Sequence, residues 1–92
     1  KNFLIKNVVE KPEINNAPSN YAIIGRYILS KKIFNILNKQ KPGKNGEIHI
    51  TDSINTMMIN NNKFVGHIFS GKYLDCGTMK GYINSTLEIS KV

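Results

Sequence analysis

The sequence predicts an α/β fold in which helices pack on a mixed β-sheet. Short apolar runs rich in strand-forming residues indicate strands, and stretches whose apolar residues recur at helical spacing indicate helices. These segments follow one another in the order strand, strand, helix, helix, strand pair, helix. Neighbouring helices and neighbouring strands exclude a simple repeating βαβ unit. We treat residues 1–92 as a single small domain.

The apolar runs predict three strands and one shorter extended piece. The second run is almost entirely apolar up to Gly25, which is typical of a strand covered on both faces. Such a strand needs a neighbour on each side. The predicted strands are Phe3–Val9, Tyr21–Arg26 and Phe64–Phe69, and the short extended piece is 72–74.

Three helices are predicted, each beginning after a residue type that favours helix N-termini. Ser30 precedes the first helix, 31–39, and Thr51-Asp52 opens the second, which runs to about Asn60. Thr78 caps the last helix. Its apolar face follows the i, i+3, i+4, i+7, i+8 pattern through Met79, Tyr82, Ile83, Thr86 and Leu87.

The chain is basic, with 13 Lys and Arg against 6 Asp and Glu and a net charge of +7. This excess supports an alternative function, a small basic interaction domain that binds RNA or dimerises. However, the cations are spread over the whole length, and Arg26 is the sole arginine, the residue type that forks onto phosphates. We therefore expect no nucleic-acid partner.

The sequence favours a cytoplasmic setting without a membrane partner. No apolar stretch approaches the roughly 18 residues that span a bilayer. The lone cysteine, Cys76, cannot form an internal disulfide, which fits a reducing compartment. Because Lys1 lies directly at the start of a strand-like run, we also expect the chain to be a fragment of a longer protein.

Four sequence blocks, in order and covering nearly the whole chain, resemble the sugar nucleotidyltransferase family. Together they are similar to the C-terminal part of its bacterial uridylyltransferases. The blocks are Val8–Pro12, Ala17–Tyr27, Lys41–Gly43 with Gly46–Ile48 and Thr51-Asp52, and Gly71–Thr78 with Gly81-Tyr82.

The resemblance implies a Rossmann-like nucleotidyltransferase that transfers uridylyl from UTP to glucose 1-phosphate, giving UDP-glucose and pyrophosphate. Members of the family also carry an N-terminal half with a Gly-rich, Arg-containing loop that holds the triphosphate, and the 92 residues contain no counterpart. We therefore expect this chain to be the sugar-phosphate-binding portion, inactive alone.

The resemblance also implies site residues. Glu10 is similar to a carboxylate that accepts hydrogen bonds from sugar hydroxyls, and Lys11 to a catalytic lysine that also binds the sugar phosphate. Gly25 would let the sugar approach the backbone. Asp75 would supply one ligand to Mg²⁺, whose other ligands are usually waters and substrate phosphates.

Each of these residues also has a purely structural interpretation. Glu10-Lys11 can be a solvated strand exit, Gly25 a bulge, and Asp75 part of the turn before the last helix. Ligands of open α/β sheets sit at the carboxyl ends of strands, so we expect Glu10, Lys11 and Asp75 to line one pocket. We also expect a homo-oligomer. The apolar faces of the helices and the strand Tyr21–Arg26 are suited to pack against β-sheet that the 92 residues do not contain, and such exposed surfaces favour association.

Overall fold

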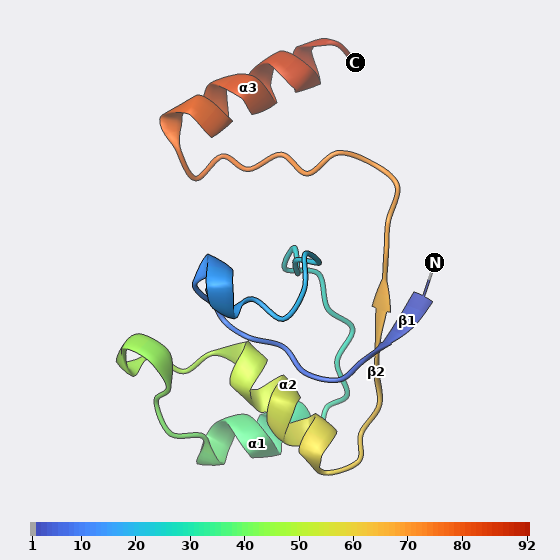
Figure 1. Ribbon diagram of the computed structural model, residues 1–92, viewed down its shortest axis with the longest axis vertical. Coiled ribbons are helices and arrows are strands. Elements are labelled where there is room, and N and C mark those ends of the chain that lie inside the picture. Colours follow the sequence, from blue (N-terminus) through green and yellow to red (C-terminus); the bar gives the residue numbers. More distant parts are fainter. Residues whose placement is uncertain (1) are drawn as a thin grey trace.

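The computed structural model describes residues 2–92 as a small α/β body and a C-terminal helix that stands apart from it (Figure 1). The radius of gyration is 15.8 Å, larger than the roughly 12 Å of a compact chain of this length, because the last helix lies away from the body. The elements are β1 (Asn2–Ile5), α1 (Ile33–Lys39), α2 (Ile50–Ile59), β2 (Phe64–His67) and α3 (Met79–Ser90), with 3-10 turns at Ile14–Asn16 and Lys44–Gly46.

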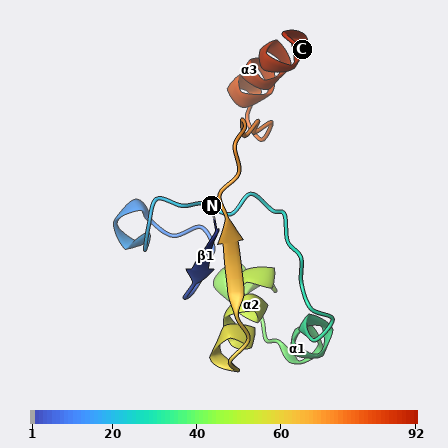
Figure 2. The ribbon, with the colours of Figure 1, turned by 90° about the vertical axis from the view of Figure 1, so that its right-hand side faces the viewer.

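β1 and β2 lie side by side and form a two-stranded antiparallel sheet (Figure 2). The register places Phe3 opposite Gly66. A Cβ atom at position 66 would lie 2.6 Å from the Phe3 ring, so a larger residue there would displace this ring. The described residues contain no parallel strand pair, so the sheet is antiparallel rather than the predicted mixed sheet.

The predicted first strand is shorter than expected, because α2 replaces a neighbouring strand beyond Ile5. The Val8 N–H donates to Asn55 Oδ1 at 2.9 Å, and Asn55 Nδ2 donates to the Val8 carbonyl at 2.6 Å. One side chain of α2 therefore satisfies both backbone groups of Val8, which is buried. Val8 thus keeps its backbone hydrogen bonds although it does not belong to a sheet.

The prediction of a strand at Tyr21–Arg26 is wrong for this structure. None of these residues has strand structure, and no strand among residues 2–92 pairs with them. Gly25 interrupts the run with φ +74, a conformation that an extended strand does not use. Tyr21 instead stacks its ring on Phe3, with ring centroids 5.3 Å apart.

The core lies where α1 and α2 pack together and Val8 meets them. Met57 is 1% exposed, and the other buried apolar side chains are Val8, Ile33 and Ile54. Partly buried apolar residues from β1, β2 and both helices surround this cluster, among them Ile5, Leu37 and Phe64. This packing fixes α2 against the segment that follows β1. The same segment leads to Glu10 and Lys11.

The three predicted helices are confirmed, with small shifts at the starts of α1 and α2. α1 begins at Ile33, because Ser30 accepts a hydrogen bond from the Lys32 N–H in the preceding turn. α2 begins at Ile50 without a side-chain cap. No helix among the described residues has the length and apolar character needed to cross a bilayer.

α3 begins as predicted, with Thr78 Oγ1 accepting from the Gly81 N–H at 3.0 Å. The helix packs on the extended segment before it through small residues, Gly81 and the buried Ser85. Its predicted apolar face points away from this contact and is exposed. The exposed fractions are 75% for Met79, 58% for Tyr82, 51% for Ile83 and 56% for Leu87.

Candidate functional site

The Glu10 side chain is held by the first turn of α2. Thr51 Oγ1 donates to Glu10 Oε2 at 3.1 Å, and Thr51 itself is 4% exposed. A carboxylate beside a helix N-terminus also interacts favourably with the positive end of the helix dipole. The half-buried Glu10 carboxylate therefore has a defined position, with acceptor capacity left for further donors.

Lys11 lies in a turn with an unusual backbone. Its φ of +41 is rare for a residue other than glycine. Lys44 Nζ bridges this turn by donating to the Glu10 carbonyl at 3.3 Å and to the Lys11 carbonyl. The Lys11 side chain is exposed, so its ammonium is open to an anion.

Gly25 is exposed and has φ +74. A Cβ atom built on it would meet no atom within 4 Å. Within this chain, glycine is therefore favoured at position 25 by the left-handed backbone and not by a crowded neighbour. The open space above Gly25 leaves room for a ligand to approach the backbone.

Asp75 lies in the exposed segment between β2 and α3. Its Oδ1 accepts from the Gly77 N–H at 2.9 Å, which closes a tight turn before the Thr78 cap. This bond uses one of two carboxylate oxygens. Among the described residues no three His, Cys, Asp or Glu side chains gather at metal-binding distance. A Mg²⁺ ion that takes one protein carboxylate and otherwise waters and phosphates would use the other oxygen of Asp75.

The structure does not join the Glu10-Lys11 pair to Asp75 at one sheet edge. Antiparallel pairing places the carboxyl ends of β1 and β2 at opposite ends of the sheet, so the strand-end argument fails here. Beyond the sheet, both connecting segments run toward the same side of the molecule (Figure 1). No hydrogen bond between described residues connects Asp75 with Glu10 or Lys11.

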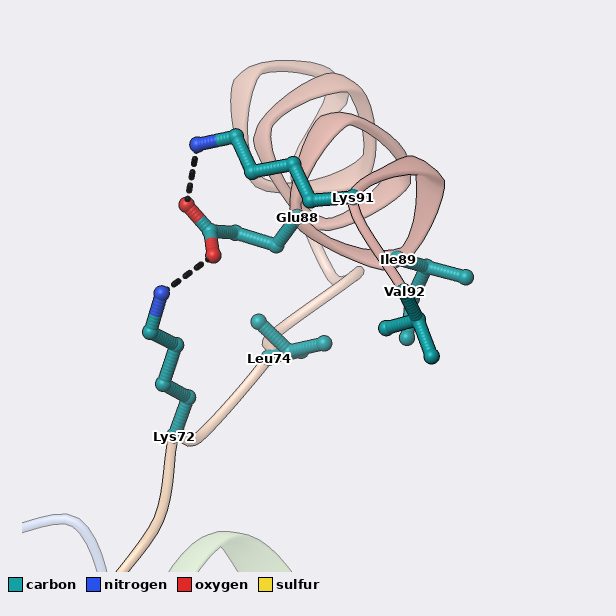
Figure 3. A pocket seen from close by; sticks show the side chains of 6 residues that line it. All are labelled: Lys72, Leu74, Glu88, Ile89, Lys91 and Val92. Atoms are coloured by element: carbon teal, nitrogen blue, oxygen red, sulfur yellow. Dashed lines mark hydrogen bonds and ion pairs between the residues drawn. The ribbon is translucent and has the colours of Figure 1, made fainter.

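A shallow, open pocket of about 380 Å³ lies between α3 and the extended segment before it (Figure 3). Its lining residue Leu74 directly precedes Asp75, whereas Glu10 and Lys11 are not among its lining residues. Leu74 and Ile89 supply apolar lining. Glu88 accepts from Lys72 and, at 3.2 Å, from Lys91 Nζ. The hydrogen bond from Lys72, then that from Lys91, lowers the pKa of the Glu88 carboxyl. The Lys72–Glu88 ion pair links α3 to the segment before it at an exposed surface.

Sequence reasoning missed two residues of the site, Lys44 and Thr51. Thr51 was assigned to a helix cap, whereas its hydroxyl bonds a carboxylate 41 residues earlier. Lys44 lies between α1 and α2, outside both helices that the sequence predicts. The one available signal was that Thr51 belongs to a block of the family resemblance.

Comparison with known proteins matches residues 1–92 to the nucleotidyl transferase family model. The UTP–glucose-1-phosphate uridylyltransferase of Pseudomonas aeruginosa is 45% identical over 84 residues, 91% of this chain and 30% of that protein. UTP–glucose-1-phosphate uridylyltransferase 2 of Streptococcus pyogenes is 41% identical over 86 residues, 94% of this chain and 28% of that protein. The chain thus spans less than a third of the length of these relatives.

Solved structures give the same result. A crystal structure of UDP-glucose pyrophosphorylase complexed with UDP-glucose superposes with a TM-score of 0.88 and 47% identity. The match covers 98% of this chain and 34% of the other. The apo form of UDP-glucose pyrophosphorylase matches with a TM-score of 0.84 at the same identity. The predicted α/β nucleotidyltransferase-like fold is thereby confirmed.

Proposed function

Because this chain belongs to the nucleotidyl transferase family, we propose that it is the sugar-phosphate-binding portion of a UTP–glucose-1-phosphate uridylyltransferase. The complete enzyme would form UDP-glucose and pyrophosphate. The supporting observation is the 47% identity and TM-score of 0.88, over 98% of the chain, to the enzyme that was crystallised with UDP-glucose. Such a reaction depends on positioning and electrostatics around phosphorus and requires no covalent protein intermediate.

Glu10 and Lys11 are the proposed centre of this function. The Glu10 carboxylate accepts hydrogen bonds from sugar hydroxyls, while Thr51 keeps its orientation fixed. The Lys11 ammonium neutralises the phosphate of glucose 1-phosphate, so that its oxygen can approach the negatively charged triphosphate of UTP. In this proposal the phosphate oxygen attacks the α-phosphorus of UTP, and pyrophosphate leaves.

Gly25 and Asp75 have supporting roles in the proposal. The open space above Gly25 admits the sugar close to the backbone. Asp75 would hold one position of a Mg²⁺ ion, which supplies positive charge to the phosphates when bound. Asp75 also keeps its turn through Gly77. A Rossmann-like whole domain and a cytoplasmic location, consistent with the lone Cys76, belong to the same proposal.

Binding of glucose 1-phosphate to the chain tests the function. An NMR titration should shift the amide signals of Glu10, Lys11 and Gly25. Glu10→Ala should abolish the shifts, while Glu13→Ala, an exposed glutamate nearby in sequence, should leave them unchanged. The proposed site would be disproved if Glu10→Ala bound glucose 1-phosphate as well as the unmodified chain does. Amide shifts confined to other segments would disprove it too.

We also propose that the chain forms homo-oligomers through the exposed apolar face of α3. Met79, Tyr82, Ile83 and Leu87 are all more than half exposed on one side of this helix. An apolar face of this kind favours association in water. Sedimentation velocity tests whether the chain is an oligomer or a monomer.

A further inference from the structure

Two side chains from the segment 44–51 hold the Glu10-Lys11 turn from different sides. Thr51 Oγ1 bonds the carboxylate of Glu10 at 3.1 Å. Lys44 Nζ bonds the two successive backbone carbonyls of Glu10 and Lys11. We call Lys44 and Thr51 together the clamp. One member acts on a side chain, and the other acts on the backbone.

The backbone contact has a physical reason. Lys11 has φ +41, and a residue with a Cβ atom needs compensation to remain in this region. Pro12 follows directly and further restricts the conformation of Lys11. Hydrogen bonds from an ammonium are charge-assisted and therefore stronger than neutral ones. Lys44 supplies two of them to the carbonyls that flank the strained position.

Lys44 is itself held in place by its loop. His49 Nε2 lies 2.9 Å from the Lys44 carbonyl, and the Gly43 N–H donates to the Glu47 carbonyl at 2.8 Å. Gly43 packs closely on α2: a Cβ atom there would lie 2.5 Å from Asp52 Oδ2, so the Asp52 side chain would have to move. The loop is thus closed against the start of α2.

Thr51 is equally fixed, since it is 4% exposed in the first turn of α2. The same helix carries Asn55, which bonds both backbone groups of Val8. Side chains of α2 therefore hold Val8 and Glu10 in place. Lys44, in the loop before α2, holds the backbone of Lys11. Glu10 and Lys11 thus take their positions from α2 together with the loop that precedes it.

We propose that Lys44 and Thr51 are positioning residues for sugar-phosphate binding, and this rests on the proposed function. Thr51 orients the Glu10 carboxylate toward the sugar. Lys44 fixes the turn that presents the Lys11 ammonium to the phosphate. The two residues thus act on different parts of one ligand, which makes their effects separable.

The test is an NMR titration of the chain with glucose 1-phosphate and, separately, with inorganic phosphate. Thr51→Val should weaken glucose 1-phosphate binding about tenfold, the scale of one lost hydrogen bond to a charged group, and leave phosphate binding unchanged. Thr51→Ser, which keeps the hydroxyl, should restore affinity. Thr56→Val, on the exposed side of α2, is the matched control.

Lys44→Met should weaken the binding of both ligands, because the Lys11 turn loses its two hydrogen bonds from Lys44. The methionine keeps most of the aliphatic part of the lysine side chain. Lys44→Arg should recover part of the affinity. Lys63→Met removes the same charge from an exposed position between α2 and β2, and it should have a much smaller effect. Equal losses in Lys44→Met and Lys63→Met would overturn the role of Lys44. Equal loss of both ligands in Thr51→Val, or no rescue by serine, would overturn that of Thr51.

A chain that binds neither ligand would count against the proposed function, and the clamp would then be decided by the unliganded spectra. The Glu10 side-chain signals should shift in Thr51→Val and return in Thr51→Ser. The Lys11 amide signal should shift in Lys44→Met and stay in place in Lys63→Met. Unchanged Glu10 and Lys11 signals would overturn the clamp itself.

Discussion

Asn55 on α2 forms both backbone hydrogen bonds of Val8, so a side-chain amide takes the place of a neighbouring strand. Replacing it by alanine leaves a buried N–H and carbonyl without partners. We expect Asn55→Ala to lower the free energy of unfolding by about 1 to 3 kcal/mol. Urea unfolding followed by circular dichroism measures this. Asn35→Ala, exposed on α1, is the control, and equal stability of the two variants would contradict the prediction.

Gly81→Ala should detach α3 from the segment that precedes it. A Cβ atom at position 81 would clash with the backbone carbonyl of Asp75. Overpacking of this kind costs about 1 to 3 kcal/mol, which exceeds the roughly 0.5 to 1 kcal/mol that alanine gains over glycine in a helix. Amide hydrogen exchange in α3 should therefore accelerate. Asn84→Ala, exposed on the same helix, should slow it, and slower exchange in Gly81→Ala would refute the clash.

The contact of Glu88 with Lys72 and Lys91 should weaken in acid. The folded pKa of Glu88 is lowered by these lysines, below an unfolded value of about 4.3. Its stabilisation is therefore fully present above that unfolded value and is lost as the pH falls through the folded pKa. The side-chain NMR signals of Lys72 and Lys91 should therefore move as the pH falls below the usual glutamate range, because both lysines lose their charged partner. Glu88→Gln should remove this pH dependence and Glu13→Gln should keep it; identical titrations of the two would speak against the contact.

Self-association should be visible in sedimentation velocity at micromolar concentration. Leu87→Glu places a charge on the exposed apolar face of α3 and should shift the chain toward monomer. Glu replacing Asn84, on the same helix but outside the face formed by Met79, Tyr82, Ile83 and Leu87, is the matched control. A monodisperse monomer of the unmodified chain would contradict the proposed oligomer.

The chain alone should produce no detectable UDP-glucose from UTP, glucose 1-phosphate and Mg²⁺. Catalysis of this type requires the triphosphate to be held in line with the attacking oxygen. The 92 residues contain no Gly-rich, Arg-containing loop of the kind that the family resemblance associates with that task. The Pseudomonas aeruginosa relative provides the positive control. Turnover by the pure chain would show that the site is more complete than proposed.

Local signals were sufficient for parts of the fold. The Thr78 cap and the following helix were predictable because the cap bond spans only three residues. The strand predicted at Tyr21–Arg26 does not form, since strand structure requires a partner that no local pattern supplies. The apolar face of α3 was predicted correctly, although its exposure depends on what surrounds the helix.

In the site, too, local sequence identifies some residues, whereas tertiary contacts are needed to find the others. The Glu10-Lys11 pair was identified from a motif, but its supports come from residues more than 30 positions away. Thr51 and Lys44 have ordinary local interpretations, as a cap and as part of a loop. Only tertiary packing reveals that they contact the pair. The roles of Glu10, Lys11, Gly25 and Asp75 stay predictions until ligand binding is measured.

The pairing of Asn2 with His67 has a consequence for synthesis of the protein. The two residues are 65 positions apart, so a ribosome working at about 5 to 20 residues per second exposes β1 for roughly 3 to 13 seconds before its partner emerges. During that interval β1 lacks β2, its partner in the structure. Residues 10 and 11 follow β1 directly, so the segment that carries them waits for the same pairing.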